Sequence, residues 1–167
     1  EKHIAVNAIP VHDYRLPVGL FDIIHILPAQ EHYIILMDER GKLTLKKIMK
    51  EQAASHLLAI RNKTMVKDGK IQLNFLNGYN LLVPDGKYKA GDSLVLQGKK
   101  IMKHLKMEKG ATVYLIGGKY SGKIGTVEEI KTFKGFEKDR IIFKEKNHTY
   151  ETLKEYAFVI EKEFKDE

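Results

Sequence analysis

A run of glycines between two alternating segments constrains this chain more than any other feature. Residues 110–130 read GATVYLIGGKYSGKIGTVEEI, with alternating apolar side chains on both sides of a glycine-rich centre. That centre contains Gly117, Gly118, Gly122 and Gly125. Glycine permits backbone conformations and close approaches that a Cβ excludes. The pattern therefore predicts two strands joined by a sharp bend.

The same segment partly matches a phosphate-binding loop. Gly117, four further residues and then Gly122-Lys123 satisfy most of the pattern G-x-x-x-x-G-K-[ST]. Ile124 stands where a hydroxyl would hold magnesium, and a strand pattern continues where the loop needs a helix N-terminus. The sequence therefore disfavours a nucleotide site, and we expect no cofactor.

The segment closely resembles the KOW motif. Gly110 opens it, and Gly118, Gly122 and Gly125 form its Gly-x-x-x-Gly-x-x-Gly core. The resemblance implies an SH3-like barrel that binds RNA or protein. We expect the rest of this barrel as strands and one turn at residues 140–144, 148–151, 153–155 and 156–160.

Most of the remaining chain predicts short strands. Asp68-Gly69 is typical of a two-residue type I′ hairpin turn. The exception is the segment from Met49 to Ile60, whose residue types and apolar stripe predict a helix of about two to three turns without a good N-cap. Strands are expected at residues 20–26, 33–37, 42–46, 63–67, 70–75, 79–83, 93–96 and 99–106.

The basic excess of the chain is typical either of a protein with a polyanionic partner or of an ordinary solvated lysine-rich surface. The chain has 29 Lys and Arg against 22 Asp and Glu, and residues 99–146 alone hold 13 basic and 6 acidic side chains. Lysine and arginine release counterions when they neutralise phosphates, so RNA is a natural partner. The chain has no cysteine, and its seven histidines lack a paired ligand spacing, so we expect neither disulfides nor a metal site. We find no pairing of a nucleophile with a base of the kind that would predict an enzyme.

The wider chain resembles a ribosomal family. Leu16 to Ile24, Gly41 to Ala53 and Asn80 to Leu96 are similar, in order, to segments of small-subunit ribosomal protein four of the e type, a family of archaea and eukaryotes. The resemblance implies a structural protein of the small ribosomal subunit that binds rRNA, takes part in translation, neighbours other ribosomal proteins and is not an enzyme. Asp22 recurs in the first of these segments, where we expect it to bond a turn or the backbone.

The expected fold is mainly β: a central β domain with one short helix, followed by an SH3-like KOW barrel. We expect residues 1–15 to be the remnant of a truncated N-terminal RNA-binding domain, 16–107 to be the central domain and 108–167 the barrel. The protein is expected to be cytoplasmic, ribosome-associated and monomeric off the ribosome, with no membrane span. A KOW-domain transcription-elongation or RNA-processing factor that binds a protein is the alternative.

Exposed basic positions and one tyrosine are the predicted RNA contacts. Tyr120 lies in the glycine-rich bend, where we expect its ring to be exposed and able to stack on a base. The full predicted set is Lys103, His104, Lys106, Lys119, Tyr120, Lys123, Lys131, Lys134 and Arg140.

Overall fold

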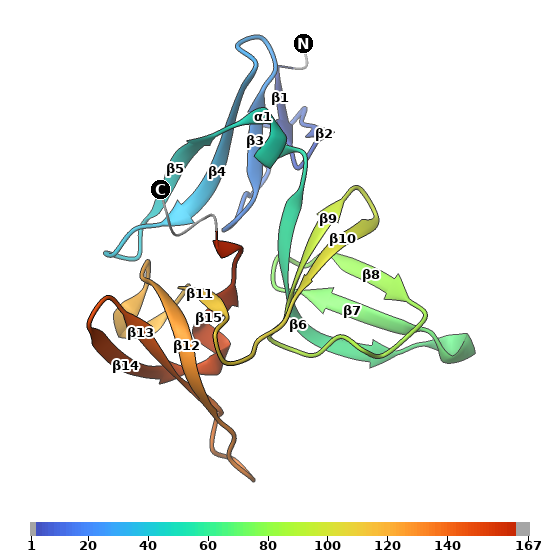
Figure 1. Cartoon of the computed structure of the whole chain (residues 1–167). Helices are drawn as coiled ribbons and strands as arrows, with labels where there is room; N and C mark the ends of the chain where they lie inside the picture. Colours follow the sequence, from blue (N-terminus) through green and yellow to red (C-terminus); the bar gives the residue numbers. More distant parts are fainter. Residues whose placement is uncertain (1–2, 163–167) are drawn as a thin grey trace.

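The alternating segments of the chain form three five-stranded sheets that meet at a shared apolar centre (Figure 1). The computed structural model describes residues 3–162, and every strand pair in it is antiparallel. Within those residues, no helix has the length and apolar character that crossing a membrane requires. The mainly β fold predicted from the sequence is confirmed.

The first sheet has the strand order β2-β1-β3-β4-β5. Its strands are β1 (Ile4–Val6), β2 (Ile9–Pro10), β3 (Ile23–Ile26), β4 (Glu31–Met37) and β5 (Leu43–Ile48). Its last two strands correspond to the segments predicted at residues 33–37 and 42–46, and they pair as an antiparallel hairpin. Because β1 pairs with β3, this sheet contains residues on both sides of the boundary expected after residue 15.

The helix predicted between Met49 and Ile60 is wrong in its extent. The helix α1 covers only Lys50–Ala53, and at its N-terminus the Gln52 side chain accepts a hydrogen bond from the Met49 N–H at 3.1 Å. From His56 onward the chain is extended, and Leu57 pairs with Val95 of a later strand. Sheet pairing therefore overrides the helix preference of these residues.

The second sheet has the order β10-β9-β6-β7-β8. Its strands are β6 (His56–Met65), β7 (Ile71–Phe75), β8 (Asn80–Val83), β9 (Ser93–Gln97) and β10 (Lys100–Leu105). The turn between β6 and β7 is the 3-10 segment η1 (Lys67–Gly69), closed by a bond from the Val66 N–H to the Lys70 carbonyl. Asp68 and Gly69 have positive φ angles as expected, but the loop has three residues, so the two-residue type I′ prediction is wrong.

The third sheet has the order β14-β13-β12-β11-β15, and it is the expected barrel. Its elements are β11 (Thr112–Leu115), η2 (Gly118–Tyr120), β12 (Ile124–Lys131), β13 (Arg140–Glu145), β14 (His148–Leu153), η3 (Lys154–Tyr156) and β15 (Ala157–Val159). The strands predicted after the glycine-rich bend are confirmed to within about two residues, the usual uncertainty of element boundaries.

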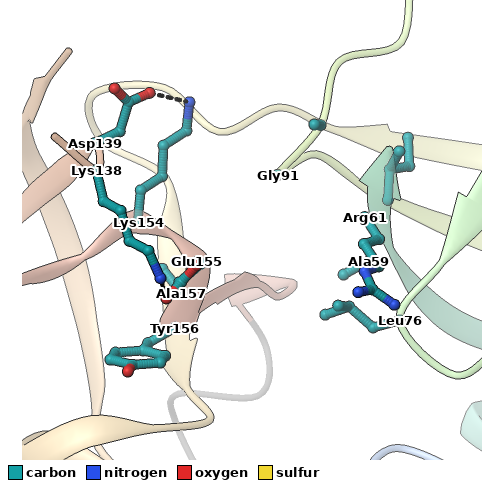
Figure 2. A pocket seen from close by; sticks show the side chains of 12 residues that line it. Ala59, Arg61, Leu76, Gly91, Lys138, Asp139, Lys154, Glu155, Tyr156 and Ala157 are labelled. Atoms are coloured by element: carbon teal, nitrogen blue, oxygen red, sulfur yellow. Dashed lines mark hydrogen bonds and ion pairs between the residues drawn. The ribbon is translucent and has the colours of Figure 1, made fainter. Parts of the chain in front are cut away.

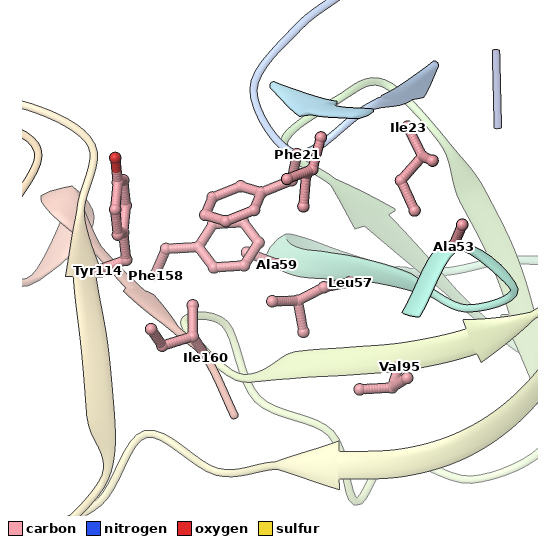
Figure 3. Close-up of a cluster of buried hydrophobic side chains, with 10 residues drawn as sticks. Phe21, Ile23, Ala53, Leu57, Ala59, Val95, Tyr114, Phe158 and Ile160 are labelled. Atoms are coloured by element: carbon pink, nitrogen blue, oxygen red, sulfur yellow. The ribbon is translucent and has the colours of Figure 1, made fainter. Parts of the chain in front are cut away.

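A buried cluster joins the three sheets (Figure 3). Phe21 precedes β3, Leu57 lies on β6, and Phe158 lies on β15. The Phe21 and Phe158 rings stack with centroids 4.2 Å apart, and Tyr114 on β11 meets Phe21 edge-on at 5.5 Å. Burial of large apolar side chains at this junction fixes the sheets relative to one another.

Candidate nucleic-acid interface

The glycine-rich bend packs against the first sheet. Gly122 has φ +80°, and a Cβ on it would lie 2.6 Å from the backbone carbonyl of Asp38, just after β4. Nearby, the Tyr114 hydroxyl accepts a hydrogen bond from the Met37 N–H at 3.0 Å and donates one to the Met37 carbonyl. The bend therefore needs glycine at position 122 because two sheets approach each other there.

Tyr120 is a correction to the sequence prediction. Its ring is half-buried rather than exposed, with its centroid 4.7 Å from that of Tyr150 and 5.9 Å from that of Phe143. The exposed group beside it is Lys119, whose Nζ lies 5.8 Å from the centre of the Tyr120 ring. Tyr120 thus packs on the barrel core, while Lys119 faces solvent.

Lys123, at the other side of the bend, is held by a carboxylate. Its Nζ lies 2.6 Å from Oε2 of Glu145 and 5.6 Å from the centre of the Tyr150 ring. The hydrogen bond to Glu145 raises the pKa of Lys123. A phosphate contacting this ammonium would compete with the carboxylate.

Two more predicted cations share one carboxylate. Lys131 and Arg140 lie on neighbouring strands and contact the two oxygens of Glu151 at 3.2 and 3.3 Å. The bond from Lys131 is the main cause of the lowered pKa of Glu151. Lys134, in the loop between these strands, is exposed and has no carboxylate partner among residues 3–162.

The predicted residues at the end of β10 and just after it also differ in whether a carboxylate holds them. Lys103 forms an ion pair with Glu161 at 2.5 Å. His104 Nε2 lies 2.8 Å from Oδ2 of the buried Asp92, so this histidine supports the fold. Lys106 is exposed, and in the described part of the chain it has no ion pair.

A groove of about 600 Å³ separates the second sheet from the barrel (Figure 2). Arg61 and Leu76 line one wall, and Lys138, Asp139 and Lys154 line the other. Lys154 Nζ is 3.6 Å from Oδ2 of Asp139, so the opposite wall is partly neutralised. The lining combines apolar side chains with an arginine whose guanidinium forms no ion pair among the described residues.

Half-buried polar groups in and beside the first sheet have structural partners, although Nε2 of His25 is buried without one. Asp22 accepts hydrogen bonds from the Gly19 N–H at 2.7 Å and the Asn7 side-chain amide at 2.8 Å, which confirms its predicted backbone role. Nδ1 of His25 lies 2.9 Å from Nδ1 of His32 on the neighbouring strand. Within residues 3–162, no group of three or more His, Asp or Glu side chains could hold a metal ion.

Sequence reasoning missed how few acidic residues the second sheet contains. Residues 56–105, the second sheet, hold nine Lys and Arg but only three Asp and Glu, whereas residues 106–162 hold twelve and nine. Two of those three acids are engaged, Asp92 with His104 and Asp85 with Lys87 at 3.4 Å. The chain has no glutamate between Glu51 and Glu108, a signal that the count over residues 99–146 does not show.

Comparison with known proteins gives matches along nearly the whole chain. The model of the ribosomal family S4e matches residues 29–101, and the KOW motif model matches residues 109–144. A small ribosomal subunit protein eS4 from Methanospirillum hungatei is 38% identical over 170 residues, spanning 98% of this chain and 70% of the relative. The eS4 of Archaeoglobus fulgidus is 36% identical, with coverage of 98% and 69%.

A solved structure agrees with these sequence matches. The crystal structure of the 30S ribosomal protein S4e from Thermoplasma acidophilum superposes with a TM-score of 0.85 at 28% identity. The match covers 95% of this chain and 80% of the crystallised one. The likeness therefore extends over all three sheets.

Proposed function

The chain belongs to the ribosomal S4e family, and from this premise we propose that it is a structural constituent of the small ribosomal subunit that binds rRNA without catalysis. The observation that carries the proposal is the match to small ribosomal subunit proteins eS4 along 98% of the chain. The net charge of +7 agrees with it, because an rRNA-binding protein must neutralise phosphates.

The proposal includes the surroundings of the protein. Its partners would be small-subunit rRNA and neighbouring ribosomal proteins. It would be part of ribosomes in the cytoplasm and would be a monomer when it is not bound to them. The division into a central domain at residues 16–107 and a barrel at 108–167 also stays a proposal. It is supported by the sheet boundary between β10 and β11.

The predicted basic RNA contacts, in the barrel and at the end of the second sheet, stay proposals that differ in whether a carboxylate already holds the cation. Lys106, Lys119 and Lys134 are exposed and have no carboxylate partner in residues 3–162, so their charges can meet phosphate directly. By contrast, Lys103, Lys123, Lys131 and Arg140 must first exchange a carboxylate for a phosphate.

Sedimentation tests this function. A tagged chain expressed in an archaeal host of the family should sediment with small subunits at one copy per particle, and high salt should be needed to remove it. Sedimentation with an RNA polymerase, or with neither particle, would instead favour the KOW-factor alternative.

A further inference from the structure

Neutral polar side chains occupy most of the outward face of three strands in the second sheet, together with the exposed Leu82 opposite Gln72. The cross-strand register aligns Asn62 of β6 with Asn74 of β7 and Asn80 of β8, and Thr64 with Gln72 in the next row. The opposite face of the same strands carries Leu73, Phe75 and Val83 of a buried cluster. The amide ladder, defined as Asn62, Thr64, Gln72, Asn74 and Asn80, therefore faces away from the core.

Hydrogen bonds within the amide ladder fix its orientation. The Asn74 side-chain amide donates to Oδ1 of Asn62 at 2.6 Å and to Oγ1 of Thr64 at 3.2 Å. Its carbonyl oxygen accepts from Nε2 of Gln72 at 2.7 Å. The side-chain NH₂ group and the carbonyl oxygen of Asn74 are therefore both used within the ladder. The Asn62 amide N–H groups, the Thr64 hydroxyl proton and the Gln72 carbonyl oxygen remain available to a partner. The face thus presents donors and an acceptor held in place by Asn74.

Three cations lie beside the ladder, one within β6 and two around the turn that joins β6 to β7. Arg61 precedes Asn62 on β6, and Lys67 and Lys70 lie around the β6–β7 turn. All three are exposed, and none has an ion pair among the described residues. The neutral face is therefore bordered by three cations outside ion pairs, and the one carboxylate beside them is that of Asp68, in the turn between Lys67 and Lys70.

We propose that the amide ladder and its three bordering cations bind the minor groove of an A-form RNA duplex. That groove is wide and shallow and displays 2′-hydroxyls, which donate and accept hydrogen bonds as amides and hydroxyls do. Arg61, Lys67 and Lys70 would contact the phosphates on either side, which positions the protein on the duplex. The inference rests on the rRNA-binding function proposed above and names the RNA form recognised by one face.

The composition of the face distinguishes this partner from others. Recognition of single-stranded RNA uses aromatic side chains that stack on splayed bases, and the outward positions of these three strands carry no aromatic side chain. The core of a protein–protein interface is usually apolar and aromatic, whereas this face is amide and hydroxyl apart from Leu82. DNA duplexes share the phosphates but lack the 2′-hydroxyl.

Binding to matched probes tests the inference. The probes are an RNA duplex of about 20 base pairs, the DNA duplex of the same sequence, and one RNA strand alone. The wild-type chain should bind the RNA duplex most tightly. Replacing one amide and one hydroxyl, Asn62→Ala with Thr64→Ala, should weaken RNA-duplex binding about tenfold and change DNA binding less than twofold.

Asn147→Ala with Thr149→Ala is the matched control, since it removes one exposed amide and one exposed hydroxyl from the barrel and should leave all affinities unchanged. A second variant, Asn80→Ala, should also weaken only RNA-duplex binding. Unchanged RNA affinity in both ladder variants, or equal loss for RNA and DNA duplexes, would overturn the inference. If the wild type sediments with small subunits yet binds RNA and DNA duplexes equally, the inference fails while the proposed function stands. Absence of sedimentation with small subunits would remove both.

Discussion

Phe21 and Phe158 stack with their ring centroids 4.2 Å apart, although Phe21 precedes β3 of the first sheet, Phe158 lies on β15 of the barrel, and the two are 137 positions apart in the chain. Phe21 also has φ +65°, a backbone conformation that is costly for a bulky side chain. The stack compensates for that cost and connects the first sheet to the last strand of the barrel (Figure 3).

Removing this stack should destabilise the whole chain. Phe21→Ala is expected to lower the free energy of unfolding by about 3–5 kcal/mol, the usual cost of deleting a buried phenylalanine. Phe136→Ala, at a fully exposed position, should change it by less than about 0.5 kcal/mol. Denaturant unfolding measures both variants, and similar losses would show that Phe21 is not central to the packing.

Two glycines with similar φ angles separate backbone strain from crowding. Gly122 has φ +80° and no room for a Cβ, whereas Gly41 has φ +76° and no atom within 4 Å of the Cβ position. Both alanine variants carry the strain of a positive φ. Gly122→Ala should cost about 1–3 kcal/mol more than Gly41→Ala, because only the former forces the bend away from Asp38. Equal costs in thermal unfolding would contradict the close approach of the barrel and the first sheet.

Stability should fall as the pH falls below about 6.5, the ordinary pKa of histidine. The pKa of His25 is lowered by burial and by repulsion from His32 and His56, and burial also lowers the pKa of His56. The folded state binds these protons less readily than the unfolded state, so acid favours unfolding. The stability that comes from keeping the two histidines neutral is fully present above the unfolded pKa and is lost as the pH falls.

The comparison to make is unfolding at about pH 7.5 and about pH 5.5, on either side of that value. On going from the higher to the lower pH, His25→Gln should lose less free energy of unfolding than the wild type loses. His12→Gln, at an exposed position, should lose as much as the wild type. An unchanged loss in the His25 variant would rule out this histidine as a source of the pH dependence.

The bend lysines should respond differently to charge reversal. Lys123→Glu places a second carboxylate beside Glu145 and should lower the melting temperature. Lys119→Glu, at an exposed position, should leave unfolding within about 0.5 kcal/mol of the wild type and weaken rRNA binding if the bend meets phosphate. Unchanged rRNA binding in a folded Lys119→Glu variant would remove the bend from the interface.

The barrel was predictable because its signals are local. Gly110 and the Gly118, Gly122, Gly125 core specify the bend, and alternating residues specify the strands that follow. The helix after Met49 was predicted too long because its continuation depends on pairing with β9, which lies far downstream in the chain. Local propensity carries no information about such a partner.

The candidate interface was less predictable for a similar reason. A basic residue in the sequence does not show whether a carboxylate neutralises it, and Lys131, Arg140 and Glu151 meet only across paired strands. The exposure predicted for Tyr120 failed because Tyr150 and Phe143 approach it from two other strands. The shortage of acidic residues is visible in the sequence, but the bounds of the second sheet depend on which strands pair with one another.

The salt dependence of rRNA binding tests most directly whether the second sheet carries the RNA contacts. Replacing Arg61, Lys67 and Lys70 with alanine removes three cations without ion pairs in the described residues, and replacing Lys123, Lys131 and Arg140 removes three that are paired with carboxylates. Both sets lower the net charge equally. The first should flatten the slope of log K against log salt by about 2–3, and the second by less than about 1. Equal flattening by the two sets, or a wild-type slope near zero, would contradict the account.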